Sequence, residues 1–483
     1  MVISKKEIKF PLKKYRGYIL LLVTFVILFP AIEAKAQTTP PPSGPVYIIQ
    51  PGDSLSGIAG QFGVSINDLM NANNIADPNA ISAGTEVIIP GLEGINGILK
   101  TQIVDFGDTL RSISRQNQIN SYLLRKLNHI TSPSELYAGV SFVLPQQENA
   151  VNLTNRITLS NNESLLEASI LNDTDPWTIA RTNELGGTWD GNQGDILFRS
   201  GENPGDTKHT GLPASMDNVE INPLPLVQGS TIVIKIKGSS ITTIEGKMID
   251  HTLHFFPTTE GTFAALQGIN ALLKPGPYPL HLTATLADGS KQSFEQMVIV
   301  KTPQNPYPND PMLSVDPATI DPAVTQPEID QVTSITSVTT PAKYWQDMFQ
   351  LPVAPDYCVK SRFGNRRAYN GGNYDNFHAG LDFGICSSTN PFDIYAPADG
   401  VVVYTGKLVV RGNATIIDHG WGVFTGYWHQ EDILVNVGDK VTTGQLIGHI
   451  GSTGRVTGPH LHWEIWVNGE QVNPTDWLNI TYP

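Results

Sequence analysis

The stretch GSTGRVTGPHLHWEIW, residues 451–466, contains two histidines, His460 and His462, that are separated by one residue. The residues after Pro459 are rich in aromatic and β-branched side chains, which favours a β-strand. On a strand, residues i and i+2 point to the same face. We therefore expect His460 and His462 to enter one cleft together.

A second pattern, HAGLD at residues 378–382, places His378 and Asp382 four residues apart. Glycines flank the pair, so we expect a bending strand or loop there and not a helix. Two imidazoles and one carboxylate suit a catalytic Zn²⁺ with an open fourth position, where a bound water has a pKa of about 7. The sequence has no H-E-x-x-H motif, so histidines must supply the acid–base groups, and His429 is available for this.

The motifs HAGLD, YWHQ, VNVGDKVTTGQLIGHIGSTG and TGPHLHWE together resemble the lysostaphin/LytM type of zinc endopeptidase, over about residues 358–477. The resemblance implies an open, mostly antiparallel β-sheet domain, which we place at residues 343–483. It implies hydrolysis of peptide bonds in the stem or cross-bridge of peptidoglycan. The implied zinc ligands are His378, Asp382 and His462, and the implied catalytic residues are His429 and His460. The division of proton transfer between the last two stays open.

Three residues upstream of His378 are further candidates for the cleft. Arg366, in SRFGNRR, would pair with a carboxylate of the site or substrate, or form a structural ion pair. Tyr369 or Tyr374 would reach the oxyanion that forms during hydrolysis.

The N-terminal half contains a repeat with a period of 55 residues. GDSL at residues 52–55 recurs as GDTL at 107–110, and a worn third copy follows at 156–201, with Asn162-Glu163 in place of Gly-Asp. Between two β-favouring ends, apolar residues recur at helical spacing, and Ser54 and Ser65 suit helix N-caps. Each copy is therefore predicted to fold as strand–helix–helix–strand, a small α+β unit.

The first copy closely resembles the LysM module, which implies binding to the N-acetylglucosamine units of peptidoglycan or chitin. We place the copies at residues 46–91, 101–146 and 156–201; the loss of Gly-Asp puts glycan binding by the third copy in doubt. The alternative is that the copies are spacers. The expected glycan-binding residues are Gly52, Asp53, Ser54 and Asn73 in the first copy and Gly107, Asp108, Thr109 and Asn128 in the second.

Two segments separate the repeats from the C-terminal domain. Residues 224–302 contain short alternating runs with turn residues between them, which predicts an immunoglobulin-like β-sandwich. Residues 303–342 are rich in Pro, Asp, Thr and Ser, and we expect an extended, acidic linker there.

Residues 1–36 have the order of a signal peptide: a basic start, an apolar run and an A-x-A sequence. An uncleaved anchor is the alternative, and both imply export to the cell wall or the medium. Export permits disulfides, so the only two cysteines, Cys358 and Cys386, are expected to pair. The alternative is two buried, reduced thiols.

The chain of 483 residues has a formal net charge of −14, which disfavours nucleic acid as a partner. A zinc endopeptidase that is tethered to peptidoglycan is the leading hypothesis. Two alternatives remain: a non-catalytic regulator that binds the wall, which the complete set of five site residues disfavours, and a peptidase that acts on proteins.

Overall fold

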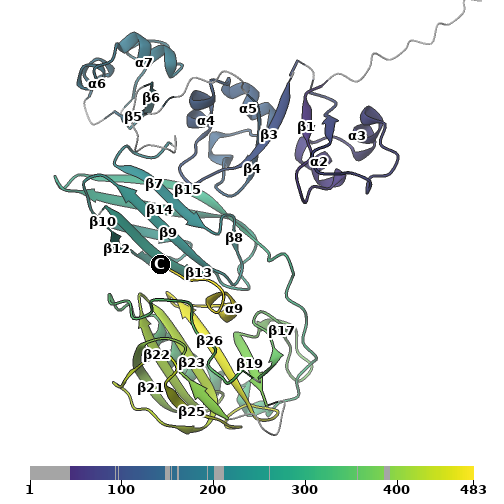
Figure 1. Cartoon of the computed structure of the whole chain (residues 1–483), viewed down its shortest axis with the longest axis vertical. Coiled ribbons are helices and arrows are strands. Elements are labelled where there is room, and N and C mark those ends of the chain that lie inside the picture. The colour runs from purple at the N-terminus through teal and green to yellow at the C-terminus, as the bar shows by residue number, and fades with distance from the viewer. Residues whose placement is uncertain are drawn as a thin grey trace, which may run out of the picture.

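The computed structural model describes residues 44–385 and 392–483, except residues 93, 96, 147–152, 154, 160–162, 193, 201–210, 260 and 356. The expected signal peptide and Cys386 lie outside the described residues, so the leader and the disulfide stay predictions. Within the described part, no helix is long and apolar enough to cross a bilayer. Figure 1 shows an elongated chain with the repeats at one end and the C-terminal β domain at the other.

Each of the three repeats folds as strand–helix–helix–strand, as predicted. The elements are β1 (Val46–Ile48), α2 (Leu55–Phe62), α3 (Ile66–Asn73) and β2 (Glu86–Ile88); β3 (Ile98–Ile103), α4 (Leu110–Asn117), α5 (Ser121–Leu127) and β4 (Ser141–Pro145); β5 (Asn155–Thr158), α6 (Leu165–Leu171), α7 (Pro176–Thr182) and β6 (Ile196–Arg199). β1 pairs with both β2 and β3, so the first two repeats share one sheet, whereas β5 and β6 pair separately.

The helices of the first repeat begin where the sequence predicts. The hydroxyls of Ser54 and Ser65 accept hydrogen bonds from backbone N–H groups of the first turns of α2 and α3. α2 ends at Gly63, whose φ of 64° is left-handed and easily adopted by glycine. The apolar faces of both helices pack on Tyr47 and Val87 of the sheet.

The middle of the chain forms two sheets with a shared apolar core. The strands are β7 (Met216–Asn222), β8 (Leu226–Val227), β9 (Thr231–Gly238), β10 (Ile241–Met248), β11 (His251–His254), β12 (Phe256–Thr259), β13 (Thr262–Gly268), β14 (Gly276–Leu286) and β15 (Lys291–Lys301). One sheet has the order β12-β13-β9-β7 and the other β11-β10-β14-β15-β8. Strand β7 lies before residue 224, so the predicted start of this domain was too late. Strand β7 was not recognised from the sequence because it is an edge strand with alternate polar residues and a proline directly after it.

The expectation of an extended linker at residues 303–342 was wrong for its second half. The 3₁₀ turn Pro317–Thr319 and helix α8 (Pro322–Thr336) occupy it. Asp321 caps the helix by accepting from the N–H of Ala323, and Pro322 takes a first-turn position that needs no N–H donor. Buried Val332 packs with Trp428 and Trp466, so tertiary contacts stabilise a helix of modest intrinsic propensity.

The C-terminal domain is built on an antiparallel sheet, as expected. Its strands are β16 (Cys358–Ser361), β17 (Arg366–Arg367), β18 (Asn376–Phe377), β19 (Gly380–Gly384), β20 (Asp393–Tyr395), β21 (Gly400–Leu408), β22 (Gly412–Gly420), β23 (Val423–Ile433), β24 (Lys440–Val441), β25 (Leu446–Ile450), β26 (His460–Val467) and β27 (Glu470–Val472), followed by helix α9 (Pro474–Trp477). The main path is β16-β19-β26-β23-β22-β21-β24. Its core also includes Val233, Ala264 and Leu266 of the middle domain, so the two domains share apolar surface.

Candidate metal and catalytic centre

Three neighbouring strands bring the predicted site residues together. β19 pairs with β26 so that Asp382 lies opposite His462, and β26 pairs with β23 so that His462 lies opposite Trp428. The close approach of β19 requires Gly380, because a Cβ there would lie 2.2 Å from the carbonyl oxygen of Trp463. The strand pattern of residues 460–466 was therefore correct, and it places His460 and His462 on one cleft.

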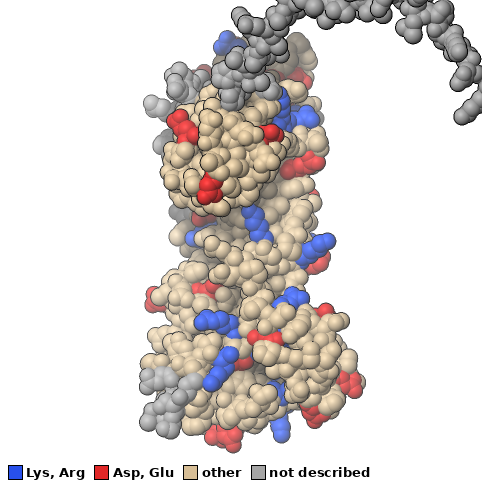
Figure 2. Space-filling view, turned by 90° about the vertical axis from the view of Figure 1, so that its right-hand side faces the viewer, with Lys and Arg blue, Asp and Glu red and all other residues tan. Residues whose placement is uncertain are grey.

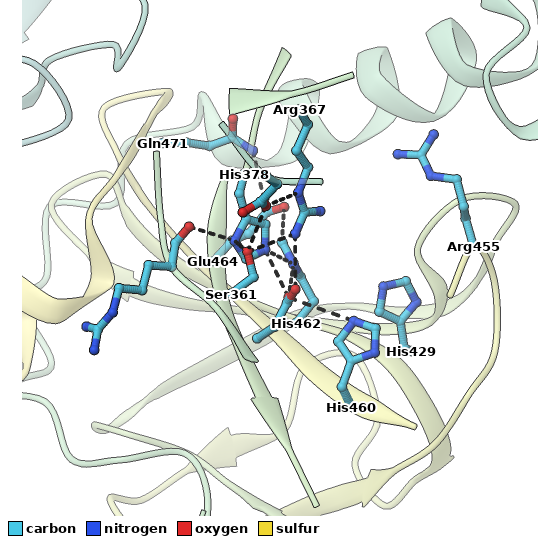
Figure 3. Close-up of polar contacts among 12 residues, drawn as sticks. Ser361, Arg367, His378, His429, Arg455, His460, His462, Glu464 and Gln471 are labelled. Carbon is cyan, nitrogen blue, oxygen red and sulfur yellow. Dashed lines mark hydrogen bonds and ion pairs between the residues drawn. The ribbon is translucent and has the colours of Figure 1, made fainter. Parts of the chain in front are cut away.

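His378, Asp382 and His462 converge on one point. His378 Nε2 lies 2.9 Å from Asp382 Oδ1 and 2.8 Å from His462 Nδ1. Asp382 Oδ1 lies 2.7 Å from His462 Nδ1. All three residues are buried, and Figure 3 shows the His378 and His462 rings close together. Their ligand atoms lie within 4.8 Å of one another, which is the arrangement expected of a metal site.

The outer nitrogens of both imidazoles face acceptors. His378 Nδ1 is 2.9 Å from the carbonyl oxygen of Arg362, and His462 Nε2 is 2.9 Å from Glu464 Oε1. A carbonyl or carboxylate oxygen can only accept, so each outer nitrogen carries the proton. In the neutral rings the inner nitrogens then present lone pairs toward the Asp382 carboxylate. This tautomer is the one that metal-binding histidines adopt.

The electrostatics of the trio favour positive charge at its centre. Burial alone would raise the pKa of Asp382, but the neighbouring imidazoles, first that of His462, hold it well below its ordinary value. Burial alone would lower the pKa of His462, yet the Asp382 carboxylate raises it. Burial lowers the pKa of His378, so that ring tends to stay neutral. A divalent cation satisfies such a donor set better than a proton shared among three groups.

His429 and His460 lie beside the trio, with ring centroids 4.8 Å apart. His429 Nδ1 donates to the carbonyl oxygen of Thr453 and His460 Nδ1 to that of Gly458, both at 2.8 Å, which leaves the lone pairs on Nε2. The register between β22 and β23 shifts in the segment that contains His429, whose φ is 65°. This bulge turns the His429 side chain into the cleft. Burial lowers the pKa of both rings, that of His429 to about 3.

The guanidinium at the site belongs to Arg367 and not to the predicted Arg366. Arg367 Nη2 donates to Asp382 Oδ2 at 3.1 Å, whereas Arg366 Nη2 donates to the carbonyl oxygen of Tyr374. Adjacent residues on β17 point to opposite sides, which explains the exchange. The hydroxyl of Tyr374 donates to the carbonyl oxygen of Asp310. Tyr374 is thus engaged in holding the chain upstream of the domain.

The cleft has a volume of about 750 Å³ and is lined by the trio, His429 and His460. Tyr369 lines the cleft too. The guanidinium carbon Cζ of Arg455 lies over the Tyr369 ring, 4.7 Å from its centroid. Arg367, Ser361 and Glu464 were not among the site residues predicted from the sequence. Glu464 could have been found, because it follows His462 by two residues and so shares its face of the strand.

The predicted glycan-binding residues of the first repeat make internal contacts. Asp53 accepts hydrogen bonds from the Tyr47 hydroxyl and the Gln50 N–H, both at 2.8 Å, and so shapes the turn that contains Gly52. The Asn73 amide bonds the N–H and carbonyl of Ile88, and with Ser54 as an N-cap these side chains hold the module together.

The corresponding residues of the second repeat make internal contacts too, and two of them also contact the middle domain. Asn128 clamps Val143 as Asn73 clamps Ile88, and Thr109 caps α4. The N–H of Gly107 and the carbonyl of Asp108 both bond the side chain of Gln296 on β15. The Gly-Asp loop of the second copy therefore faces the middle domain.

Comparison with known proteins agrees with this division of the chain. Residues 376–474 match the model of peptidase family M23, and residues 47–90 and 103–145 match the LysM domain. The peptidoglycan DD-endopeptidase ShyA of Vibrio cholerae is 43% identical over 122 residues, which is 25% of this chain and 28% of that protein. The DD-carboxypeptidase/endopeptidase Mpg of Neisseria meningitidis is 43% identical over 97 residues, which is 20% of this chain and 22% of that protein.

Among solved structures, the catalytic domain of lysostaphin from Staphylococcus simulans is 30% identical, with a TM-score of 0.23; the match covers 26% of this chain and 94% of that chain. The chain matches less than a third of the length of the two curated relatives. The chain thus carries a peptidase family M23 domain at residues 376–474, preceded by two LysM domains at residues 47–90 and 103–145.

Proposed function

We propose that the protein is an exported zinc metalloendopeptidase that hydrolyses peptide bonds in the stem or cross-bridge of peptidoglycan. The observation that carries the proposal is the convergence of the inner nitrogens of His378 and His462 on Oδ1 of Asp382. Their outer nitrogens face acceptors, so in the neutral rings the inner nitrogens present lone pairs toward this carboxylate oxygen.

Zinc fits this donor set, because two imidazoles and one carboxylate are a common set of ligands for catalytic zinc. His378, Asp382 and His462 would hold the ion, and the bound ion supplies Lewis acidity that polarises a peptide carbonyl and acidifies a water. The Glu464 carboxylate would hold His462 in its ligand tautomer by accepting from Nε2.

His429 and His460 would move the protons of the reaction. Both rings keep a lone pair on Nε2 while Nδ1 donates to a carbonyl oxygen. Their lowered pKa values keep the rings neutral at neutral pH, so either can accept a proton from the attacking water. The protonated ring would then donate to the leaving amine.

The names of the relatives favour one class of bond. ShyA is named a peptidoglycan DD-endopeptidase, and Mpg a DD-carboxypeptidase/endopeptidase. We therefore expect this chain to cut a peptide bond between two D-configured centres, as occurs where two stems are cross-linked.

The LysM domains would hold the enzyme on its polymer and so raise the local concentration of cleavable bonds. The first repeat is the better candidate for glycan binding, because the Gly-Asp loop of the second contacts Gln296. A cleaved leader at residues 1–36 and location at the cell wall complete the proposal.

For the middle domain we propose an immunoglobulin-like fold. Its two sheets, β12-β13-β9-β7 and β11-β10-β14-β15-β8, follow the order that strands D-E-B-A and C′-C-F-G take in immunoglobulin domains. Strand β8 runs parallel to β15 as a short addition at the edge of the second sheet.

Digestion of purified sacculi followed by mass spectrometry of the fragments tests the function. The expected products are uncross-linked stems with one new amino group per cut, formed by the wild type and not by His462→Ala. Intact cross-links, or cleavage of casein but not of sacculi, would contradict the proposed substrate.

A further inference from the structure

One wall of the cleft comes from the chain upstream of the matched peptidase domain. Residues 310–333, which include most of α8, contribute Asp310, Leu313, Ile329 and Val332 to the lining. This segment docks through its backbone: the N–H of Asp310 donates to the carbonyl of Arg366, and that of Leu313 to the carbonyl of Ala368. It is therefore held against the site by regular hydrogen bonds beside β17.

The Asp310 carboxylate bonds three side chains of the domain. Its Oδ1 accepts from Asn365 Nδ2 at 2.6 Å. Its Oδ2 accepts from Ser361 Oγ at 3.2 Å and forms an ion pair with Arg367 Nε at 3.4 Å. The side chains of Asp310 and Arg367 are each only 17% exposed, so solvent screens this pair less than a surface pair.

Two of these three partners, Arg367 and Ser361, also contact the trio. Arg367 Nη2 donates to Asp382 Oδ2 at 3.1 Å, and Ser361 Oγ lies 3.0 Å from His378 Nδ1 (Figure 3). The oxygen of Asp382 that Arg367 holds is Oδ2, whereas Oδ1 faces both histidines. The guanidinium therefore fixes the outer oxygen and leaves the inner oxygen for a ligand.

An arginine beside a carboxylate tends to form a two-pronged pair that engages both oxygens. Here one of the donors that such a pair could use is already engaged, because Nε of Arg367 is paired with Asp310. Without this pairing the guanidinium could turn and bond both Oδ1 and Oδ2 of Asp382. It would then compete with a metal ion for the inner oxygen.

We propose that Asp310 is a positioning residue of the metal site: by engaging Nε of Arg367, it restricts that guanidinium to Oδ2 of Asp382 and keeps Oδ1 available to the metal. The inference rests on the proposed function, since it assumes that the trio holds zinc. It extends the functional site to a residue 66 positions before the start of the match to the family model.

The test is the zinc affinity of the full chain, measured by competition with a chromophoric chelator at pH 7.5. The Asp310→Asn variant keeps the shape of the side chain but removes its charge, and outer-sphere changes of this kind typically weaken metal binding by about 10–100-fold. The matched control is Asp330→Asn on α8, which removes an exposed carboxylate that accepts from Gln326 on the same helix. Cleavage by Asp310→Asn should recover when zinc is saturating.

A double-variant cycle tests whether Asp310 acts through Arg367. Arg367→Met removes the competing guanidinium, so adding Asp310→Asn to it should cost little further affinity. Additive losses would overturn the route through Arg367. An Asp310→Asn variant that binds zinc as tightly as Asp330→Asn would overturn the inference and leave the proposed function standing. A wild type that binds no zinc in the same titration would overturn both.

Discussion

The C-terminal domain contains buried histidines in two different situations. His419, on β22, is fully buried, and both of its nitrogens meet neutral partners: the carbonyl of Asp399 at 2.7 Å and the Thr425 hydroxyl at 2.8 Å. His378 and His462 are also buried, but their inner nitrogens face each other and a carboxylate. Burial therefore does not distinguish a structural histidine from a proposed metal ligand; the convergence of unshared electron pairs does.

The face of the molecule in Figure 2 offers no such distinction. Figure 2 shows acidic and basic side chains scattered over a mostly uncharged face, and neither charge forms a large continuous patch there. The distinguishing group of ionisable side chains lies instead in the cleft, which the site histidines and Arg367 line.

The largest effect is expected when one histidine of the trio and one histidine with neutral partners are each replaced. His462→Ala should lose zinc and bring cleavage below detection, because it deletes a ligand and leaves Asp382 without its nearest imidazole. His419→Gln should keep both zinc and cleavage. Zinc content and sacculus digestion of the two variants are the measurements. Loss of zinc in His419→Gln alone would reverse the assignment.

A smaller effect is expected from the two histidines beside the trio. His429→Ala and His460→Ala should retain about one zinc per chain but lower kcat by about 10²–10⁴-fold, which is the usual contribution of an acid–base group. Metal analysis and initial rates at saturating zinc separate these variants from His462→Ala. Near-normal turnover of His429→Ala would remove that ring from the mechanism.

Acid is expected to destabilise the folded domain through His419. The pKa of His419 falls from 6.5 to about 4 on burial, so between these values the unfolded chain binds the proton that the folded domain refuses. Stability should therefore decrease as pH falls from about 6.5 to 4, by on the order of 3 kcal/mol from this residue. Urea unfolding at saturating zinc, compared between wild type and His419→Gln, measures the contribution. Equal pH slopes for the two proteins would contradict it.

The smallest effect is expected in the first repeat, where a partly buried polar side chain again meets neutral partners. Asn73→Ala deletes the amide that bonds the backbone of Ile88 and Leu69, and should destabilise the module by about 1–3 kcal/mol. Hydrogen exchange of β2 amides reports the loss. If Asn73 contacts glycan directly, binding to insoluble peptidoglycan would instead be lost with exchange unchanged.

Much of the fold followed from local patterns. The repeat at 55 residues located the LysM domains, and the i, i+2 spacing of His460 and His462 placed both in one cleft. Helix α8 was missed because its stability depends on packing against Trp428 and Trp466, which are about a hundred residues or more away in sequence.

Only those residues of the site that lie within recognisable sequence motifs were predicted correctly. Arg367 was confused with Arg366, since the side that each faces depends on the pairing of β17 with β18. Asp310 has no motif at all. Its place follows from the docking of a distant segment, which no spacing within the domain encodes.

The most direct test of the account is the dependence of cleavage on zinc in the wild-type protein. Metal analysis of the purified chain should find about one zinc ion per molecule. Chelation should abolish the release of new amino groups from sacculi, and added Zn²⁺ should restore it. Full cleavage after complete demetallation would contradict the assignment of His378, Asp382 and His462 as the ligands of a catalytic zinc.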